Sequence, residues 1–429
     1  MSMNRYFHVV NPWWENKTFD YGIIRPDYLN KLEKNFDQTI IQILTGLRRV
    51  GKNTLSLQLI HILIEKKKVN PNRILFFSIE EPLISKISII DIINEFRLEH
   101  NIKSGTKIFV FIDEIQFREN WEQEIKSLYD SENIKFVLTG SSAVFLSDRL
   151  SYLTGRYLKT QVFPLNFAEY LSFKKITYSE IDSFLMQKHL EDFLDNGGIP
   201  EYVLNKVDRY LETTVESILF KDLVSKFQLR NPSILTDLIY LLSDRVGTTT
   251  SSLKLSKILE INKDTVLTYL DYLNKTYITS ELNNYSTSRN KEIYNPPKIY
   301  FDDTGICNKY SSKINLGALA ENAIYNSIKT ALVGKLRIKF GYWYENKSEI
   351  DFVISQNNKK VLIESKYVSS ENDINFSALE SALKVIEPEK ILYITKDLVG
   401  KSRIGSSTVR FIPLREFLLK GIEEYMSFS

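Results

Sequence analysis

Few residues in this sequence are of the kinds that form disulfides or metal clusters. Among 429 residues there are one cysteine, Cys307, and four scattered histidines. A single cysteine cannot form an internal disulfide, and so few cysteines and histidines exclude a Cys/His metal cluster. A histidine-based zinc site or catalytic triad is not expected either.

Long apolar runs are also missing. No run reaches the roughly 18–20 residues that a bilayer span requires, so no membrane partner is expected. The first 17 residues include Arg5, Glu15 and four aromatic side chains, without the continuous apolar stretch of a secretory signal. The expected location is therefore the cytoplasm.

An excess of charge of one sign is absent as well. The chain has 56 Lys and Arg residues against 53 Asp and Glu residues, for a net charge of +3. This balance neither requires nor excludes a nucleic-acid partner, because local patches decide that question. A composition of 43% hydrophobic and 25% charged residues is typical of a globular protein, and the length predicts two or three domains.

Short β-branched runs alternate with helical patterns in the first half of the chain. The predicted strands are 39–45, 73–79, 106–112 and 134–139, and the predicted helices are 54–67, 87–101 and 121–130. This alternation indicates βαβ units and a parallel sheet covered on both faces. Continuously apolar strands fit central positions in such a sheet.

A glycine-rich stretch joins the first predicted strand to the first predicted helix. It consists of Gly46, Leu47, Arg48, Arg49, Val50, Gly51, Lys52, Asn53 and Thr54. In this position glycines let backbone N–H groups surround a phosphate, the helix N-terminus adds a positive dipole end, and Lys52 reaches the outer phosphates.

Asn53 departs from the pattern of such loops, which have Ser or Thr after the lysine as a ligand of Mg²⁺. A carboxamide oxygen can substitute for the hydroxyl, but its longer side chain changes the reach, and Thr54 points elsewhere on the helix. The sequence thus predicts nucleotide binding more strongly than efficient hydrolysis.

Two later strands end in polar residues that complete the predicted site. Asp113 ends an apolar strand and is a candidate Mg²⁺ ligand, and Glu114 is a candidate base that orients water. The next strand ends in Thr139, Gly140, Ser141 and Ser142, where Ser141 would sense the γ-phosphate. The alternatives are a strand capped by solvated acids and a plain exit from a strand.

An ordered series of motifs extends along most of the chain: 46–54, 113–116 with Trp121, 138–142, 153–156, 164–170, 197–201, 301–305 and 317–322. It resembles prokaryotic AAA-type ATPases of the archaeal-ATPase branch, which carry an uncharacterised C-terminal region. The resemblance implies binding of ATP with Mg²⁺ and hydrolysis of ATP. Arg156 is then a candidate arginine finger or sensor, or else a structural arginine paired to an acid.

The second half of the chain changes character twice. Helical patterns dominate 166–230, and helices near 253–259 and 264–275 precede extended runs at 278–282 and 291–300, which is a winged-helix layout. Lys263, Asp264 and Asp271 leave the presumed recognition helix without the basic face that DNA contact requires. Packing against protein is an equally good interpretation.

Four residues near the C-terminus form a second candidate site. Glu364 and Lys366 share one strand face, antiparallel pairing would bring Asp351 beside Glu364, and Glu321 lies on the preceding helix. This arrangement resembles the restriction-endonuclease-type PD-(D/E)xK site, in which Glu321, Asp351 and Glu364 would bind Mg²⁺ and Asp351, Glu364 and Lys366 would act in catalysis. Alternatively, Glu364 and Lys366 face solvent, or the domain only binds a partner.

The predicted fold class is α/β, in four parts. These are a P-loop AAA-type ATPase domain (1–165), a helical lid (166–230), a winged helix (231–300) and a restriction-endonuclease-like domain (301–429). One interpretation is a Mg²⁺-dependent ATPase coupled to a DNA-binding or nuclease-like domain, with DNA as partner. The alternative is a nucleotide-gated assembly or signalling scaffold with little turnover, self-association and no nuclease activity.

Overall fold

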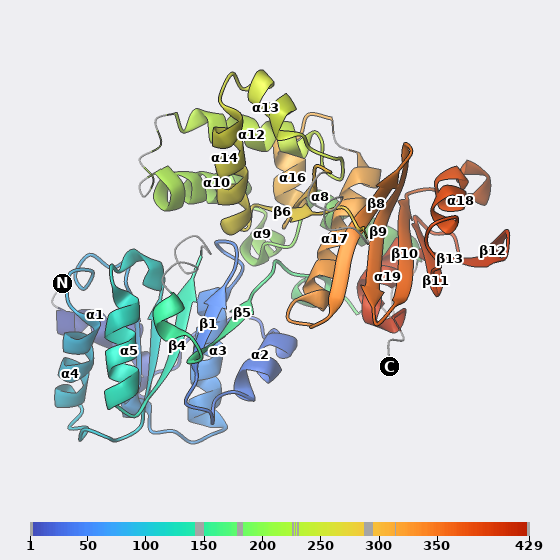
Figure 1. Cartoon of the computed structure of the whole chain (residues 1–429). Helices are drawn as coiled ribbons and strands as arrows, with labels where there is room; N and C mark the ends of the chain where they lie inside the picture. The colour runs from blue at the N-terminus through green and yellow to red at the C-terminus, as the bar shows by residue number, and fades with distance from the viewer. Residues whose placement is uncertain are drawn as a thin grey trace. The chain divides into compact units, whose positions relative to one another are not determined.

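The computed structural model describes residues 3–141, 150–177, 183–224, 227, 229, 231–286, 295–313 and 315–426. The chain forms two compact units, Met1–Val162 and Phe163–Ser429 (Figure 1). Of the predicted features, Ser142 and the start of the extended run 291–300 lie outside the described residues.

A five-stranded parallel sheet forms the centre of the first unit, with the strand order β2-β3-β4-β1-β5. Its strands are β1 (Ile41–Thr45), β2 (Ile74–Ser78), β3 (Ile108–Asp113), β4 (Ile134–Gly140) and β5 (Tyr157–Gln161). The four strands predicted from apolar runs are confirmed within two residues at each end. Residues of β1 are all buried, as expected for a strand with neighbours on both sides.

Helices cover both faces of this sheet. They are α1 (Met3–Val10), α2 (Pro26–Glu33), α3 (Lys52–Glu65), α4 (Ile89–Glu99) and α5 (Trp121–Ser131). Apolar side chains of α1, α4 and α5, among them Phe7, Phe96 and Trp121, form one core with the strands. Ser88 caps α4 by accepting a hydrogen bond from the backbone N–H of Asp91, which fixes the start of that helix.

The aromatic N-terminal segment fastens onto strand β2. The indole N–H groups of Trp13 and Trp14 both donate to the carbonyl oxygen of Ile74, at 3.1 and 2.8 Å. Asn11 accepts from the N–H of Phe76 at 2.7 Å and donates to the carbonyl oxygen of the same residue at 2.9 Å. Asn11 therefore satisfies backbone groups of an edge strand that would otherwise be left exposed.

The second unit begins with α7 (Phe167–Phe173), α8 (Ser183–Asn196), α9 (Pro200–Asn205), α10 (Tyr210–Ser217) and a π-helix (Ile218–Val224). The helical character predicted for 166–230 is thus present. Helix α8 packs against α16 (Thr304–Tyr310) and α17 (Leu316–Leu332) of the second unit. The role of this segment as an ATPase lid stays a prediction.

The glycine-containing motifs 197–201 and 301–305 are in contact in this unit. The buried carboxylate of Asp303 caps α16 and accepts a hydrogen bond from the N–H of Gly198 at 2.7 Å. A Cβ on Gly197 would lie 2.2 Å from Asp303, and one on Gly305 would lie 2.2 Å from the carbonyl oxygen of Asn196. The glycines at 197 and 305 are required because the two segments approach more closely than any side chain allows.

Three helices and a hairpin follow the π-helix: α12 (Ser233–Ser243), α13 (Ser252–Ile258), α14 (Lys263–Lys275), β6 (Thr279–Leu282) and β7 (Lys298–Phe301). The strands pair in antiparallel register, and Thr249 makes an additional antiparallel bridge with Lys298. Asn262 occupies the N-cap position of α14, but its side chain makes no capping hydrogen bond. The winged-helix assignment stays a prediction.

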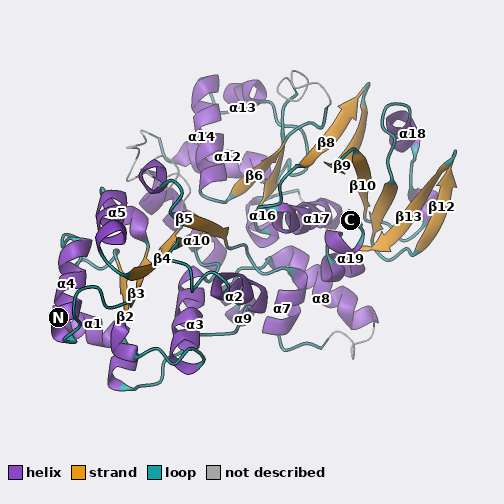
Figure 2. Ribbon diagram, turned by 60° about the horizontal axis from the view of Figure 1, so that its bottom comes forward, coloured by secondary structure: helices purple, strands orange, loops and turns teal. Residues whose placement is uncertain are grey.

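A six-stranded mixed sheet completes the unit, with the order β12-β13-β11-β10-β9-β8. Its elements are β8 (Ile338–Glu345), β9 (Ser348–Gln356), β10 (Lys359–Lys366), α18 (Ser377–Leu383), β11 (Lys390–Thr395), β12 (Gly400–Ile404), β13 (Ser407–Pro413) and α19 (Leu414–Lys420). Helix α18 covers one face, and α17 and α19 lie on the other (Figure 2). None of the described helices is long and apolar enough to span a bilayer.

Candidate functional site

The loop between β1 and α3 has the backbone shape that the glycine pattern predicts. Gly46 has φ 145°, and a Cβ there would lie 2.1 Å from the carbonyl oxygen of Val162. Gly51 has φ 93° and immediately precedes α3. Both positions favour glycine, so the loop can place its backbone N–H groups at the helix N-terminus, where an anion is stabilised.

Lys52 lies at the first position of α3 and is folded back over this loop. Its side-chain ammonium donates to the carbonyl oxygens of Gly46 and Leu47, at 3.0 and 2.9 Å, and the residue is 5% exposed. The ammonium is therefore held at the loop itself, in reach of a phosphate bound there. The next side chain, Asn53, is exposed, and Thr54 is partly buried beside Gly22.

The ends of β3 and β4 place the predicted acids beside hydroxyl groups. The Thr139 hydroxyl donates to the Asp113 carboxylate and accepts from the N–H of Glu114 at 3.1 Å. The Ser141 hydroxyl donates to Glu114 Oε2 at 3.0 Å. The interpretation of Asp113 and Glu114 as freely solvated acids is wrong, because both take part in an ordered network.

Gln116 belongs to the same network and was not predicted. Its amide donates to Glu114 and, at 2.9 Å, to Ser141 Oγ. Glu114 itself has φ 53°, a left-handed conformation that is uncommon for glutamate and turns the chain sharply after β3. The Gln116 side chain thus restrains the carboxylate that was predicted to act as base. A glutamine three residues after a strand gives no sequence signal of that role.

Burial raises the pKa of Asp113 to about 6, and the neighbouring charge of Glu114 adds to this effect. A bound cation would reverse the shift by stabilising the charged form. The Asp113 carboxylate and the Asn53 carboxamide each offer an oxygen, the donor type that Mg²⁺ prefers. The residues at this site therefore fit Mg²⁺ together with a nucleotide.

Several arginines lie at the loop 46–51, and one of them, Arg25, was not predicted from the sequence. Arg25 is 3% exposed and donates to the carbonyl oxygen of Val50 at 3.1 Å, so it supports the loop from outside. Arg48, predicted to contact the nucleotide, pairs with Glu80 at 3.2 Å. Arg49 has φ 66°, a left-handed conformation.

Arg156 does not lie near the loop of its own chain. Its carbonyl oxygen accepts from the N–H of Ile41, at the start of β1, whereas the loop follows the end of β1. Five residues of strand separate the two by roughly 16 Å. The side chain instead pairs with Asp130 at 3.2 Å. This pairing is the arrangement of the structural alternative, an arginine paired to an acid, and a role for Arg156 as arginine finger or sensor stays a prediction.

Strands β9 and β10 bring Asp351 and Glu364 together as predicted. The backbone N–H of Asp351 donates to Glu364 Oε1 at 3.3 Å, and the N–H of Ser365 donates to Asp351 Oδ2 at 3.0 Å. Lys366 pairs with Glu364 at 2.8 Å. Glu364 is 3% exposed, so the interpretation that it faces solvent is wrong.

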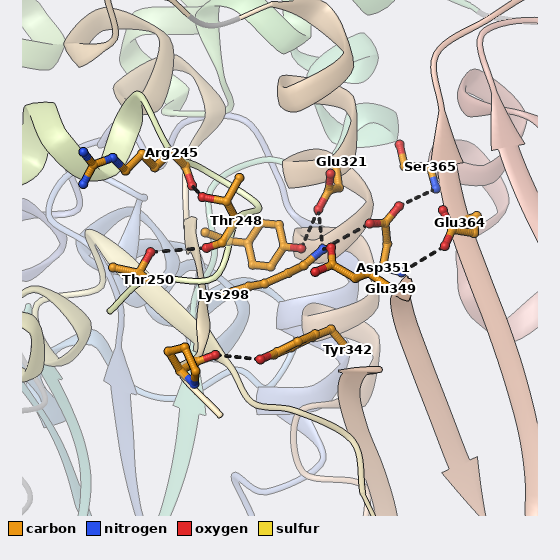
Figure 3. A network of polar contacts seen from close by, with 12 residues as sticks. Arg245, Thr248, Thr250, Lys298, Glu321, Tyr342, Glu349, Asp351, Glu364 and Ser365 are labelled. Atoms are coloured by element: carbon orange, nitrogen blue, oxygen red, sulfur yellow. Dashed lines mark hydrogen bonds and ion pairs between the residues drawn. The ribbon is translucent and has the colours of Figure 1, made fainter. Parts of the chain in front are cut away.

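Lys298, which the sequence analysis missed, lies among three carboxylates (Figure 3). Its ammonium is 2.7 Å from Glu349, 3.1 Å from Asp351 and 3.4 Å from Glu321. We call Lys298, Glu321, Glu349, Asp351, Glu364 and Lys366 the C-terminal acidic centre. Lysine in an apolar strand 53 residues before Asp351 gives no sequence signal of this contact.

The pKa values in this centre follow from burial and from the two lysines. Burial raises the pKa of Glu364 to about 8 and that of Glu321 to about 7, and the charge of Asp351 adds to both shifts. Burial acts in the same sense on Asp351, but the charges of Lys298 and Lys366 outweigh it and lower its pKa. Burial opposes the charge of Lys298, yet nearby acidic groups raise its pKa well above the usual value.

The predicted Mg²⁺ position at Glu321, Asp351 and Glu364 does not fit this geometry. An ammonium bridges Glu321 and Asp351, and Glu364 is turned to Lys366. Among the described residues, no three Asp, Glu, His or Cys side chains are grouped so that they could hold a metal ion. Lysine side chains of the same chain already neutralise these carboxylates.

Three sequence families match consecutive parts of the chain. Residues 38–171 match the family described as AAA domain. The first unit is therefore an AAA-type ATPase domain. Residues 187–316 and 316–417 match two domains of unknown function, DUF8612 and DUF4143, so the AAA domain is followed by two segments whose families carry no assigned activity.

Relatives that align with this chain over most of their own length are found in an archaeon and a bacterium. Uncharacterized protein MJ1637 of Methanocaldococcus jannaschii is 28% identical over 94% of this chain and 89% of its own. An uncharacterized protein of Haemophilus influenzae is 27% identical over 91% of this chain and 97% of its own. The combination of an AAA domain with this C-terminal half therefore occurs in other proteins.

Solved structures are only distantly similar. The AMPPCP-bound DnaA from Aquifex aeolicus aligns with 61% of this chain and 93% of its own, at 15% identity and a TM-score of 0.32. A DNA polymerase III gamma subunit-related protein from Thermotoga maritima aligns at 17% identity, over 58% of this chain and 99% of its own, with a TM-score of 0.26. Scores this low add nothing to the assignment of the AAA domain.

Proposed function

We propose that this protein is a Mg²⁺-dependent ATPase whose AAA domain is coupled to a partner-binding C-terminal unit. The observation that carries the proposal is the loop 46–51 with Lys52 on β1 and α3, in the same sheet as the ordered pair Asp113 and Glu114. In a parallel sheet the ends of β1, β3 and β4 meet at one edge. The phosphate-binding and water-orienting groups are thus on the same side.

Each residue has a definite task in this proposal. Backbone N–H groups of the loop and the α3 N-terminus bind the β-phosphate, and the Lys52 ammonium exchanges its loop carbonyls for phosphate oxygens. Asp113 and Asn53 would hold Mg²⁺, which neutralises charge on the phosphates when bound. Glu114 accepts the proton of the attacking water, while Gln116 and Ser141 keep its carboxylate in position.

Steady-state ATP turnover of the purified chain with Mg²⁺, together with nucleotide binding, tests this proposal. Lys52→Ala is expected to lower both, by about 100-fold or more for turnover. Glu114→Gln is expected to retain nucleotide binding and to lower turnover by roughly 10²–10⁴-fold, because the general base is lost. Turnover that neither substitution lowers would contradict the assignment of both residues.

A second candidate function is cleavage of nucleic acid by the C-terminal unit. The pairing of Asp351 with Glu364 and Lys366 on adjacent strands, after helix α17, favours it. Lys298 favours the alternative of a scaffold that binds a partner without cleavage. DNA that stimulates ATP turnover would support a nucleic-acid partner, whereas ATP-dependent self-association indifferent to DNA would support the scaffold.

A further inference from the structure

The side chain of Lys298 is the most deeply buried charge of the C-terminal acidic centre. It leaves strand β7, is 1% exposed, and ends between Glu349 and Asp351 of β9 and Glu321 of α17 (Figure 3). A buried ammonium is costly unless carboxylates and hydrogen bonds compensate it, which these three groups do. The contact joins the hairpin that follows α14 to the mixed sheet.

A divalent ion and this ammonium would compete for the same oxygens. Mg²⁺ binds carboxylate oxygens at about 2.0–2.1 Å and requires near-octahedral geometry. An ammonium 3.1 Å from Asp351 Oδ1 leaves no room for such an ion on that oxygen, and two cations so close together repel strongly in a buried site. Metal binding at Asp351 would therefore require Lys298 to leave.

Hydrogen bonds and a ring stack with α17 hold strand β7, and with it Lys298, in position. The Tyr300 hydroxyl donates to Glu321 at 2.7 Å, and its ring stacks on Tyr325 with centroids 4.2 Å apart. The Asn322 amide donates to the carbonyl oxygen of Phe301 and accepts from its N–H, both at 2.8 Å. Withdrawing the lysine by moving β7 would break all of these contacts with α17.

We propose that Lys298 is the resident cation of the C-terminal acidic centre and excludes divalent ions from Asp351. The centre is then a metal-independent ionic joint between β7, α17 and β9, and it does not support metal-dependent cleavage of phosphodiesters. This inference goes beyond the proposed ATPase function and does not depend on it, because it concerns only the second unit.

Binding of Mn²⁺ to the full chain without nucleotide, followed by electron paramagnetic resonance, tests the proposal. Introduced alone, Asp351→Asn is expected to leave Mn²⁺ binding as it is in the unsubstituted protein. Lys298→Met, which keeps the length of the side chain and removes its charge, is expected to tighten Mn²⁺ binding by at least about tenfold. Adding Asp351→Asn to that variant should abolish the gain.

Lys329→Met provides a control, because Lys329 is a partly buried lysine of the second unit that pairs with a different carboxylate, Asp302, at 2.8 Å. It should gain no Mn²⁺ site. An Asp351-dependent Mn²⁺ site in the unsubstituted protein would overturn the proposal, as would a folded Lys298→Met variant that gains none.

A second measurement needs no substitution and decides the question if Lys298→Met does not fold. Acetylation of lysines, followed by mass spectrometry, should modify Lys298 at least tenfold more slowly than the exposed Lys401. Saturating Mn²⁺ should leave this protection unchanged. Rapid modification of Lys298, or modification that Mn²⁺ accelerates, would overturn the proposal, since either result means that the ammonium leaves the carboxylates.

Discussion

Asn53 occupies the position after the lysine of the phosphate-binding loop, where such loops usually have Ser or Thr. Its side chain is exposed at the second position of α3, next to the buried Lys52. A serine hydroxyl there is shorter and lies closer to the helix, where Mg²⁺ is usually bound. The identity of this residue is thus expected to affect hydrolysis more than nucleotide binding.

Asn53→Ser should raise Mg²⁺-dependent ATP turnover by about tenfold, which corresponds to about 1.4 kcal/mol of activation free energy. Initial rates at saturating ATP measure the effect, and nucleotide affinity should change little. Asn53→Ala is the control, because it shortens the side chain without supplying a ligand. An equal rise in both variants would show that the length of Asn53, rather than its oxygen, limits turnover.

The sequence could not identify residues whose partners lie far away along the chain. Lys52 and Asp113 were predictable because glycines, a strand and a helix surround them in a fixed local order. Lys298 and Arg25 act on segments 53 and 25 residues away, and no local pattern distinguishes either from an ordinary basic residue. The surroundings of Arg156 could not be predicted for the same reason, since its distance from the loop depends on strand register.

At the scale of elements, the turn between α8 and α9 lies in close backbone contact with the segment that precedes α7. A Cβ on Gly198 would lie 2.2 Å from the carbonyl oxygen of Leu165. Gly198→Ala is therefore expected to destabilise the second unit by about 1–3 kcal/mol or more, as overpacking does. Chemical denaturation, with hydrogen exchange assigning the loss to α7 and α8, measures the effect.

Gly334→Ala is the comparison for that substitution. Gly334 has φ 80°, but nothing lies within 4 Å of a Cβ placed there. This variant carries the cost of a left-handed alanine alone, about 1–2 kcal/mol. If Gly198→Ala proved milder than Gly334→Ala, the close approach at Leu165 would not be rigid.

Attachment of helix α1 is expected to depend on pH through His8. A hydrogen bond with Glu99 raises the pKa of His8 above its ordinary value of 6.5, and a second contact with Glu15 adds to the shift. Because the folded pKa is the higher one, the stabilisation is complete below pH 6.5 and is lost as the pH rises through the folded value. His8 is more than a third exposed, so the effect should be only a few tenths of a kcal/mol.

Hydrogen exchange of α1 at pH 6 and pH 9, after correction for the intrinsic rate, measures this effect. Protection should be weaker at pH 9 in the unsubstituted protein and independent of pH in His8→Gln. The same loss of protection in both proteins would assign the pH dependence to another group, such as His100, whose pKa burial lowers.

Elements were predicted well where the hydrophobic period is regular. The strands of the AAA domain agree with their apolar patterns. The grouping of α7–α10 with the second unit could not be predicted, because it depends on contacts such as those of α8 with α16 and α17, more than 100 residues later. The local hydrophobic pattern determines whether a segment is a helix or a strand. Which other elements it packs against depends on complementary surfaces that distant parts of the chain form.

For the whole molecule, nucleotide binding is expected to stabilise the two units differently. ATP at 100 times its dissociation constant should stabilise the AAA domain by about 2.7 kcal/mol, because only the folded domain binds it. The second unit should gain stability only to the extent that it is coupled to the nucleotide site. Hydrogen exchange with and without ATP, resolved by unit, measures both effects.

Lys52→Ala is the control for this experiment, since it should remove the stabilisation of the AAA domain. Increased protection of the mixed sheet on addition of ATP would demonstrate coupling of the units. Protection confined to residues 1–162 would mean that the nucleotide state does not reach the C-terminal acidic centre, and it would contradict the coupling proposed above.

The attachment of Trp13 and Trp14 to β2 has an optical consequence. With Trp121 in α5, three of the four tryptophans belong to the AAA domain, and only Trp343 lies in the mixed sheet. Ultraviolet-excited fluorescence of the chain therefore originates mostly from one unit. In a Trp343→Phe variant, all indole emission would report on the AAA domain, so its melting could be followed separately within the intact protein.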